Sequence, residues 1–421
     1  MSAFDATLET RPAAQREAAL MAALPSFIQQ ARQRSSAWNT WLRDVDPARI
    51  TSRAALATLP VLRKHALLHH QQASRQAGGD PFGALATIGW RGLLHGRGAR
   101  RVFQSPGPIY EPEGSREDYW RTARALAAAG FVAGDLVHNA FSYHLTPGAW
   151  MMEAGAHALG CTVFPGGVGN TELQLAAISD LGPVGYVGTP SFLRILVEKA
   201  EAAGLTLPLR KALVSGEAFP PSLRDWLAER GIIGYQAYAT ADAGLIAYET
   251  PAREGLVVDE HVILEIVRPG TGDPVPEGEV GEVVVTVLNP DYPLIRFGTG
   301  DLSAVLPGPC PTGRTNTRIR GWLGRADQTT KVRGMFVHPE QVAQVLRRHP
   351  EALRARLIVS GRMADDQLTL RVETEAPSQA LQQALQSTLR EITKLRGDIA
   401  FVEPGALPND GKVIEDSRSY E

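Results

Sequence analysis

Short apolar segments alternate with helix-length segments between about residues 135 and 240, and this alternation limits the possible folds more than any other feature. The apolar segments have the length and composition of strands: GDLVHNAF, GCTVFPGG, PVGYVGTP, LRKALVSGEAF and GIIGYQAYATA. Such alternation is typical of a parallel sheet covered by helices on its faces. The chain is therefore predicted to be an α/β protein.

The flanking sequence predicts further units. Residues 12–33 predict a packing helix that Pro25 kinks or breaks. Residues from about 255 to 306 are mainly strand-forming and indicate an antiparallel β subdomain. The last part reads strand (KVRGMFV), helix, strand, strand, helix and strand, a βαββαβ pattern. We predict an N-terminal domain over 1–326, with its strand-rich subdomain at about 255–326, and a small mobile α+β domain over 327–421.

Composition excludes several classes of protein. Lys and Arg number 43 and Asp and Glu 45, which disfavours a nucleic-acid binder, although a local basic patch stays open. No apolar run reaches the roughly 18 residues of a membrane span, and residues 1–30 lack a secretory signal. Cys161 and Cys310 have no zinc-site or disulfide spacing. We expect a cytoplasmic enzyme or binding protein with no membrane partner.

Small, hydroxyl-bearing and carboxylate residues follow all five predicted strands. Open parallel sheets bind ligands beyond the carboxyl ends of their strands. The segments at these ends are Ser142-Tyr143-His144, Pro165-Gly166-Gly167, Gly188-Thr189-Pro190, Ser215-Gly216-Glu217 and Thr240-Ala241-Asp242. Loops are rich in such residues in any protein, which is the simpler explanation for a single segment. Five in register indicate a binding site.

Charged residues further along the chain suit a nucleotide. Asp301 follows a Gly-Thr-Gly turn, where its carboxylate can accept two ribose hydroxyls or cap the turn. Arg325, Lys331 and Arg333 lie near the predicted domain boundary and can hold a polyanion or form a solvated charge run. Lys412 follows a glycine that allows close approach to a ligand, although single surface lysines are common.

Taken in order, these segments resemble the adenylate-forming ligase superfamily, and most closely its phenylacetate-coenzyme A ligase branch. The resemblance covers nearly the whole chain and includes ITSRAALATLPVLRKHAL, VSGEAF, YQAYATADAGLIAYE, LIRFGTGDLSAVLPG, RIRGWLGRADQTTKVRGMFVHPEQV and LPNDGKVIEDSR. It implies that a carboxylic acid attacks ATP to form an acyl-adenylate and pyrophosphate, with Mg²⁺ bound, and that coenzyme A then releases AMP. The acid implied is aromatic, of the phenylacetate or benzoate type.

The resemblance assigns the nucleotide site by matching positions. The segment that flanks the adenine corresponds to Ser215, Gly216, Glu217 and Ala218. The loop that meets adenine, phosphate and Mg²⁺ corresponds to Tyr238, Ala239, Thr240 and Asp242, with Asp242 as the metal ligand. Asp301 matches the carboxylate that binds the ribose, and Arg325 the arginine that reaches toward the nucleotide.

The resemblance also implies a domain rotation. Asp327 matches the hinge residue, and Lys412 matches the lysine that bridges carboxylate and phosphate oxygens during adenylation. Rotation between the half-reactions removes this lysine and brings in the coenzyme A loop, formed here by Lys331, Arg333 and Gly334.

We expect the acid pocket between two loops that follow strands predicted to be adjacent. One carries Phe141, Tyr143 and His144, and the other carries Ala237, Gly244 and Ile246. Aromatic walls and small residues leave room for a flat ring. Packing of Tyr143 in the core is the alternative.

Several positions depart from the family pattern. The Ser/Thr/Gly-rich phosphate loop, which ends in Gly-Lys in relatives, is replaced by RRVFQSPGPIYEPEGSREDYW. Its prolines have no N–H and Glu111 adds negative charge, so Ser105, Gly107 and a nearby Arg100 or Arg101 would have to hold a triphosphate, weakly. Basic residues that merely end a strand are an equal explanation for these arginines.

Two smaller departures concern metals. Ala241-Asp242 stands where the branch has Thr or Ser followed by Glu, so a hydroxyl is lost and the carboxylate is one methylene shorter. A cysteine cluster of some relatives is reduced to Cys310, which predicts no structural zinc.

Three functions stay open at this point. The chain is a ligase that makes an acyl-coenzyme A, an adenylating enzyme that passes the acyl group to a carrier-protein thiol or an amine, or a nucleotide-binding protein that has lost the chemistry. We expect a monomer or homodimer.

Overall fold

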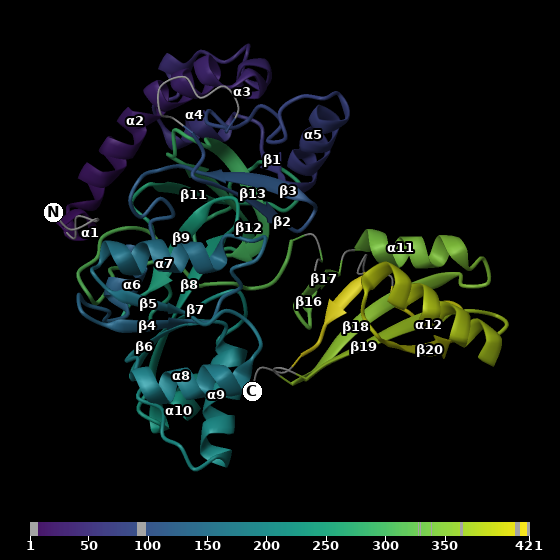
Figure 1. Ribbon diagram of the computed structural model, residues 1–421. Coiled ribbons are helices and arrows are strands. Elements are labelled where there is room, and N and C mark those ends of the chain that lie inside the picture. The colour runs from purple at the N-terminus through teal and green to yellow at the C-terminus, as the bar shows by residue number, and fades with distance from the viewer. Residues whose placement is uncertain are drawn as a thin grey trace. The chain divides into compact units, whose positions relative to one another are not determined.

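A computed structural model describes residues 7–90, 98–326, 328, 330–337, 339–362, 365–408 and 413–418 (Figure 1). The chain divides into two compact units, one ending at Leu323 and the other beginning at Gly324. The predicted hinge Asp327 and the predicted catalytic Lys412 lie outside the described residues. No helix in the described part of the chain has both the length and the apolar composition to cross a membrane.

A nine-stranded sheet in the order β14-β15-β10-β9-β8-β7-β6-β4-β5 forms the centre of the first unit. The five predicted strands are its parallel part: β4 (Leu136–Asn139), β5 (Thr162–Pro165), β6 (Gly185–Gly188), β7 (Lys211–Val214) and β8 (Ile233–Thr240). The helices between them are α7 (Gly148–Ala158), α8 (Thr171–Leu181), α9 (Pro190–Ala202) and α10 (Pro221–Glu229). The predicted α/β fold is confirmed.

Helices cover both faces of this sheet. Figure 1 shows α7, together with α6 (Ala123–Ala128), on one side and α8, α9 and α10 on the other. The chain runs outward from β4 to β5 and then crosses back to β6, so right-handed crossovers place α7 and α8 on opposite faces. The strand order thus reverses between β4 and β6, the position where sheets of this kind bind ligands.

The strand-rich segment is divided between two sheets and does not form one separate subdomain. β9 (Gly244–Glu249) pairs antiparallel with β8, and the same sheet is extended by β10 (Leu256–Val258), β15 (Arg318–Ile319) and β14 (Val305–Leu306). A second, four-stranded sheet consists of β1 (Leu62–Arg63), β13 (Leu294–Ser303), β12 (Gly281–Val287) and β11 (Val262–Val267).

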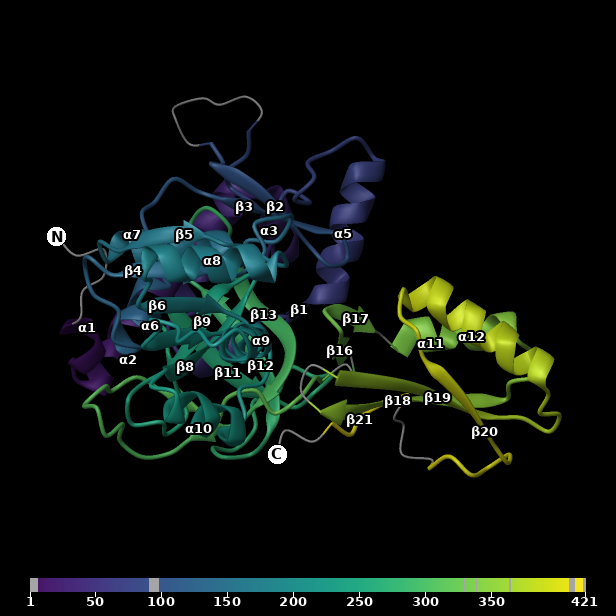
Figure 2. The ribbon, with the colours of Figure 1, turned by 60° about the horizontal axis from the view of Figure 1, so that its bottom comes forward.

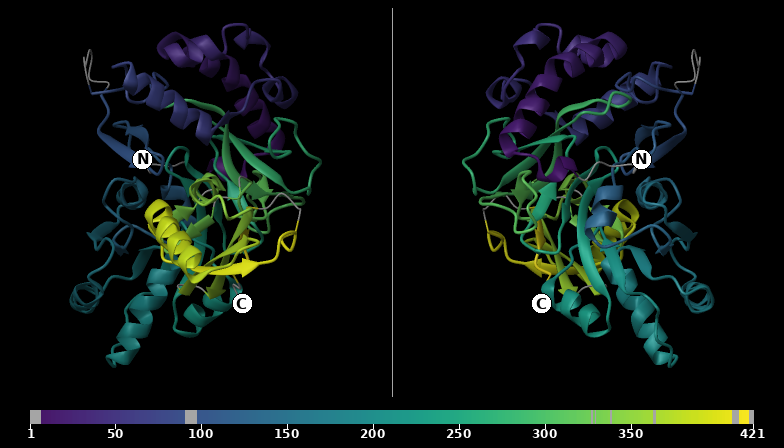
Figure 3. Two further views of the ribbon diagram at one scale, coloured as in Figure 1. Left: turned by 90° about the vertical axis from the view of Figure 1, so that its right-hand side faces the viewer. Right: turned by 90° about the vertical axis from the view of Figure 1, so that its left-hand side faces the viewer.

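Amino-terminal helices pack beside the second sheet (Figure 3). They are α2 (Ala13–Arg34), α3 (Ser36–Trp41), α4 (Arg53–Ala57) and α5 (Lys64–Gln76), with a 3-10 turn at Pro47–Arg49. The predicted break at Pro25 is wrong, because α2 runs through it. Leu24 and Ile28 on either side are fully buried against the strands, and this packing outweighs the hydrogen bond that proline removes.

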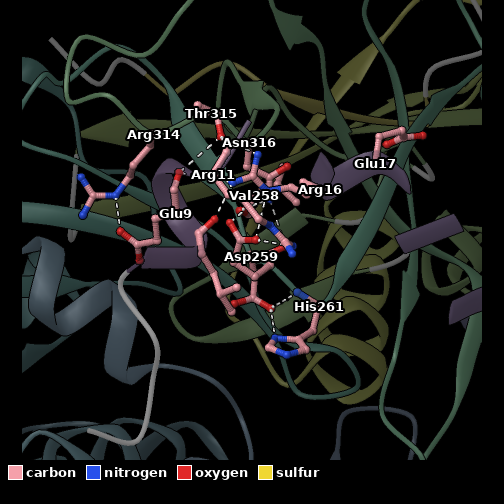
Figure 4. A network of polar contacts seen from close by, with 12 residues as sticks. Glu9, Arg11, Arg16, Glu17, Val258, Asp259, His261, Arg314, Thr315 and Asn316 are labelled. Atoms are coloured by element: carbon pink, nitrogen blue, oxygen red, sulfur yellow. Dashed lines mark hydrogen bonds and ion pairs between the residues drawn. The ribbon is translucent and has the colours of Figure 1, made fainter. Parts of the chain in front are cut away.

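Buried ion pairs fix the start of the chain (Figure 4). Glu9 of α1 (Thr7–Thr10) accepts from Arg314 at 2.7 Å and from Arg124 at 3.2 Å. Arg16 of α2 donates to Glu260 at 3.0 Å, and both side chains are buried. These contacts attach the amino-terminal arm to α6 and to the loops that follow β10 and β14.

The second unit contains a hairpin and a four-stranded sheet. β16 (Thr330–Val332) and β17 (Met335–Val337) are separate strands, so the predicted single strand KVRGMFV is wrong. Arg333 and Gly334 have φ values of +48° and +81°, which suit a two-residue hairpin turn. The sheet consists of β20 (Asp398–Val402), β19 (Asp365–Glu373), β18 (Arg354–Arg362) and β21 (Ile414–Asp416).

Two helices cover one face of this sheet, as Figure 2 shows: α11 (Pro339–Arg348) and α12 (Gln379–Thr393). Leu385 and Leu389 of α12 are fully buried with strand residues such as Leu357 and Leu370. The predicted apolar stripe of α12 therefore forms the core of the second unit, and β21 is a strand that the sequence pattern missed.

Candidate functional site

Tyr238 and Asp301 meet between the two sheets of the first unit. Tyr238 stands on β8 and donates its hydroxyl hydrogen to Asp301 Oδ2 at 2.8 Å. Asp301 stands on β13 with 7% of its surface exposed, and its backbone N–H donates to Thr299 Oγ1 at 3.1 Å. The structure thus brings together two residues assigned to the nucleotide from distant motifs, and their binding role stays a prediction.

Trp322 is a member of this group that sequence reasoning did not identify. Its Nε1 donates to Asp301 Oδ1 at 3.1 Å, while 43% of its surface remains exposed. Both carboxylate oxygens of Asp301 therefore accept hydrogen bonds from aromatic side chains. The available signal was the place of this tryptophan in GWLGRAD, beside Arg325, but its contact with β13 is not visible in the sequence.

The segment assigned to the adenine joins the ends of β7 and β8. Ser215 is buried, and its hydroxyl donates to the carbonyl of Ala237 at 2.8 Å. Gly216 has a φ of +82°, which lets the chain turn directly after β7. Glu217 is exposed and accepts from the hydroxyl of Ser191 at the start of α9 at 2.5 Å. The hydrogen bond from Ser215 to Ala237 thus joins the end of β7 to β8.

The two loops assigned to the acid pocket do not follow adjacent strands, because β6 and β7 lie between β4 and β8. Ala237 and Ile246 are buried in two different apolar clusters. At Gly244, an added Cβ would lie 3.1 Å from the Trp120 carbonyl oxygen. The expectation of adjacent strands is therefore wrong, and the assignment of these residues to an acid pocket stays a prediction.

The other loop has a defined polar contact. Tyr143 donates its hydroxyl to Glu153 of α7 at 2.7 Å and accepts from Asn139 at 3.0 Å. Its ring meets Trp150 edge-on, with 5.1 Å between ring centroids. Burial, and then the hydrogen bond and charge of Glu153, raise the pKa of Tyr143. Phe141 is partly buried near the same strand end and His144 is exposed. These aromatic groups lie on the loop after β4, where the order of the parallel strands reverses between β4 and β6.

A hairpin stands where the family has its phosphate loop. β2 (Arg101–Ser105) pairs antiparallel with β3 (Ile109–Glu113). Ser105 is 2% exposed and donates to Glu111 Oε1 at 2.5 Å. Arg101 pairs with Glu113 at 3.0 Å and lies over Trp150 at 4.0 Å. Both side chains are thus engaged within the protein, and the compensation assigned to Ser105 and Arg101 stays a prediction.

Helix α5 holds this hairpin in place. The buried side chain of Gln71 donates to the Tyr110 carbonyl at 2.9 Å and accepts from the Tyr110 N–H at 2.8 Å. An added Cβ on Gly107 would lie 3.2 Å from Leu68 of the same helix. The tip of the hairpin is thus packed against α5.

Four polar side chains gather between this hairpin, α5 and the turn after β8: Lys64, Glu111, Asp242 and Tyr292. Lys64 donates to Asp242 Oδ2 at 3.0 Å. Burial, and then the charge of Asp242, raise the pKa of Glu111 well above its ordinary value. Burial, and then Glu111 and Asp242, likewise raise the pKa of Tyr292. Sequence reasoning assigned Asp242 here but gave no role to Lys64 or Tyr292.

The remaining predicted residues belong to the second unit. The backbone N–H of Arg333 donates to Asp366 Oδ2 at 2.8 Å, and its guanidinium donates to the Asp366 carbonyl at 2.6 and 3.0 Å. These bonds fix the turn of the β16–β17 hairpin to the start of β19. The roles assigned to Arg325, Lys331 and Gly334 stay predictions.

Comparison with known proteins gives consistent matches. Residues 119–287 match the family described as AMP-binding enzyme. The chain is 31% identical to the phenylacetate-coenzyme A ligase of Aromatoleum evansii over 313 residues, 69% of this chain and 70% of that protein. It is 36% identical to that of Thermus thermophilus over 265 residues, which span 61% of this chain and 60% of the relative.

One solved structure is similar over nearly the whole length. A crystal structure of 2-hydroxyisobutyryl-CoA ligase with 2-HIB-AMP and CoA superposes with a TM-score of 0.79 at 25% identity. The match covers 98% of this chain and 92% of that one.

Proposed function

Because this chain belongs to the adenylate-forming ligases, in their phenylacetate-coenzyme A ligase-like branch, we propose that it activates a carboxylic acid with ATP and transfers the acyl group to coenzyme A. In the first half-reaction the carboxylate attacks the α-phosphate and pyrophosphate leaves. In the second the thiol attacks the mixed anhydride and AMP leaves. The protein is in these terms an AMP-forming acid–thiol ligase.

The contact between Tyr238 and Asp301 is the observation that carries this proposal. Asp301 offers two carboxylate oxygens at the edge of a buried site, a donor set suited to the two hydroxyls of a ribose. The ring of Tyr238 lies beside this carboxylate and supplies a flat surface for the adenine. When the ribose binds, its hydroxyls replace Tyr238 and Trp322 as hydrogen-bond donors to Asp301.

The chemical step depends on charge placed near the phosphate. Lys412 is assigned to the oxygens of the reacting carboxylate and α-phosphate, where a flexible ammonium offsets developing negative charge. The carboxyl groups of Asp242 and Glu111 fit a hard divalent cation, and Mg²⁺ bound there would neutralise phosphate charge. Arg325 reaches toward the nucleotide, Asp327 serves as the hinge, and Lys331, Arg333 and Gly334 form the coenzyme A loop.

An aromatic acid is the proposed substrate. The loop after β4 carries Phe141 and Tyr143, the ring of Tyr143 contacts Trp150 of α7, and aromatic groups pack well against a flat ring. The bond from Tyr143 to Glu153 holds this loop on the helix.

Pyrophosphate release with a panel of aryl and alkyl acids, measured with and without coenzyme A, tests the proposal. Acid-dependent pyrophosphate together with coenzyme A-dependent AMP supports it. Pyrophosphate without any effect of coenzyme A indicates a carrier-protein thiol or an amine as acceptor.

The hairpin in place of the phosphate loop favours a second candidate, a nucleotide-binding protein without adenylation activity. Binding of AMP with no pyrophosphate release from any acid would support that candidate and overturn the ligase.

A further inference from the structure

The β2–β3 hairpin is joined to the loop after β4 (residues 140–147), which carries Tyr143. The sheet formed by β2 and β3 has two strands, and β2 uses its other edge to bind this loop, because the Gln104 N–H donates to the Leu145 carbonyl at 2.9 Å. Leu145 has a φ of +60°, a conformation that a side chain adopts only where its surroundings hold it. The hairpin therefore contacts the loop at a constrained point.

Arg101 makes a second connection between the hairpin and this loop. Its guanidinium carbon lies 4.0 Å from the centroid of the Trp150 ring, over the face of the indole. The ring of Trp150 in turn meets the ring of Tyr143 edge-on, with 5.1 Å between centroids. A guanidinium is attracted to the face of an indole, so Arg101 holds the ring against which Tyr143 packs.

Glu113 fixes the guanidinium in this position. Arg101 and Glu113 face each other across the hairpin, and Arg101 Nη1 lies 3.0 and 3.1 Å from the two carboxylate oxygens. Glu113 is buried, with 2% of its surface exposed. Removing the cation would leave a buried carboxylate uncompensated, which is strongly unfavourable. A guanidinium that is held in this way suits the support of a neighbouring ring better than the binding of a phosphate that arrives and leaves.

The hydroxyl of Tyr143 is fixed at the other end of the ring. It donates to Glu153 of α7 at 2.7 Å and accepts from Asn139 of β4 at 3.0 Å. Asn139 is fully buried and also donates to the Ala149 carbonyl at 2.9 Å. The orientation of the Tyr143 ring is thus set by polar contacts at its hydroxyl and by Trp150 at its side.

We propose that Arg101 is a positioning residue for the carboxylic acid, because through Trp150 it holds Tyr143 in the orientation that selects an aromatic ring. This inference rests on the proposed function and deepens it by assigning the hairpin to acid selection. The sequence motif instead suggested Arg101 as a ligand of the triphosphate. The two assignments differ in a measurable way, since one concerns the KM for the acid and the other the KM for ATP.

Two variants break this chain of contacts without leaving a buried charge unpaired. Arg101→Gln combined with Glu113→Gln replaces the ion pair by two amides that can bond to each other, and it removes the cation from the indole. Trp150→Leu keeps the ion pair and removes the ring that connects it to Tyr143. Both variants should therefore have the same effect on the acid, and the second keeps the test decisive if the first does not fold.

A similar cluster elsewhere in the first unit supplies the matched control. Arg230 pairs with Glu201 at 2.7 Å, and its guanidinium carbon lies 3.8 Å from the centroid of the Trp226 ring. This cluster belongs to the ends of α9 and α10, on the face of the large sheet opposite to α7 (Figure 1). Arg230→Gln combined with Glu201→Gln therefore removes the same kind of ion pair and ring contact away from the loop after β4.

Steady-state kinetics with one aryl and one alkyl acid measure selectivity. We expect both variants to raise the KM for the aryl acid at least fivefold, while kcat, the KM for ATP and the KM for the alkyl acid change less than twofold. The control should behave as the wild type does. A higher KM for ATP with an unchanged KM for the aryl acid would overturn the proposal and assign Arg101 to the triphosphate.

Hydrogen–deuterium exchange of the ligand-free chain tests the position of the loop separately from ligase activity. Peptides that cover residues 140–147 should exchange at least fivefold faster in both variants than in the wild type, whereas peptides of α9 should not change. Unchanged exchange in this loop would contradict the support by Arg101. If the wild type releases no pyrophosphate with any acid but the variants exchange faster here, the ligase function fails and the positioning of the loop by Arg101 stands.

Discussion

The proposed ribose side of the site, formed by Tyr238 and Asp301, differs from the proposed phosphate side, formed by the β2–β3 hairpin, in how its polar groups are satisfied. Asp301 accepts hydrogen bonds through both carboxylate oxygens. Among the residues that the structure describes, Glu111 and Asp242 each leave one buried oxygen without a hydrogen-bond partner. The ribose side is complete without ligand, whereas the phosphate side is not. In the proposed site, the groups assigned to AMP are thus satisfied within the protein, whereas those assigned to the side of the outgoing phosphates are not.

The largest expected effect comes from Lys412→Ala. We expect adenylation to fall by about a hundred- to a thousandfold, because one charge that stabilises the transition state is lost. Thioester formation from a supplied acyl-adenylate should stay nearly unchanged, since the role proposed for this lysine concerns only the phosphate chemistry. Single-turnover rates of both half-reactions measure the difference. An equal loss in both would show that the domain-rotation assignment is wrong.

Asp301→Asn should weaken AMP binding by about ten- to a hundredfold, because hydrogen bonds to a charged group contribute about 1.5–3 kcal/mol. Isothermal calorimetry with AMP measures this change. Glu111→Gln is the control on the phosphate side, and its AMP affinity should equal that of the wild type. A similar loss in both variants would mean that the two sides do not act separately.

Trp322→Phe should tighten AMP binding about fivefold. The change removes an indole N–H that competes with the ribose for Asp301, and a hydrogen bond of this kind contributes about 1 kcal/mol. The same calorimetric titration measures it. Weaker binding would show that Trp322 contacts the nucleotide and does not compete with it.

The smallest expected effect is a change in how the stability of the fold depends on pH. It comes from Asp118, a carboxyl group outside both sides of the site. Burial is the main reason that the pKa of Asp118 rises from 3.8 to about 7. The folded state therefore holds a proton that the unfolded state releases above pH 4, so the free energy of unfolding falls as pH rises from about 4 to 7.

Asp118→Asn should flatten this pH dependence, because asparagine keeps an oxygen for the Ala123 N–H and has no proton to release. Urea unfolding at pH 5 and pH 7 measures the difference in the free energy of unfolding between the two pH values, for the wild type and for the variant. AMP affinity should be unaffected, and an unchanged slope in the variant would assign the pH dependence to other groups.

Local sequence patterns predicted much of the first unit and part of the site. Each parallel strand is a short apolar run with a turn residue after it, so β4 to β8 and the residues that follow them were identifiable. Tyr238 and Asp301 were identified from separate motifs. The order of the strands in the sheet could not be predicted from the sequence, because pairing between β4 and β6 depends on contacts across the whole sheet. That missing order produced the wrong expectation that the two loops assigned to the acid pocket follow adjacent strands.

Other errors have the same physical origin. β10, β14 and β15 join the large sheet through pairings between distant segments, which no local pattern specifies. The continuity of α2 through Pro25 depends on packing against strands late in the first unit. Lys64 reaches Asp242 from 178 residues away in sequence, so its contact with the site was visible only in the structure.

The ion pairs of the amino-terminal arm have a consequence for how the chain folds during synthesis. Glu9 and Arg314 are separated by 305 positions, and Arg16 and Glu260 by 244. Contacts of such high sequence separation form late, because the chain between them must first be ordered. During synthesis this arm must wait for almost the entire first unit to emerge from the ribosome before its charges are matched. During that interval the apolar face of α2 stays uncovered, and a chaperone that shields this helix would bind it before the rest of the first unit has emerged.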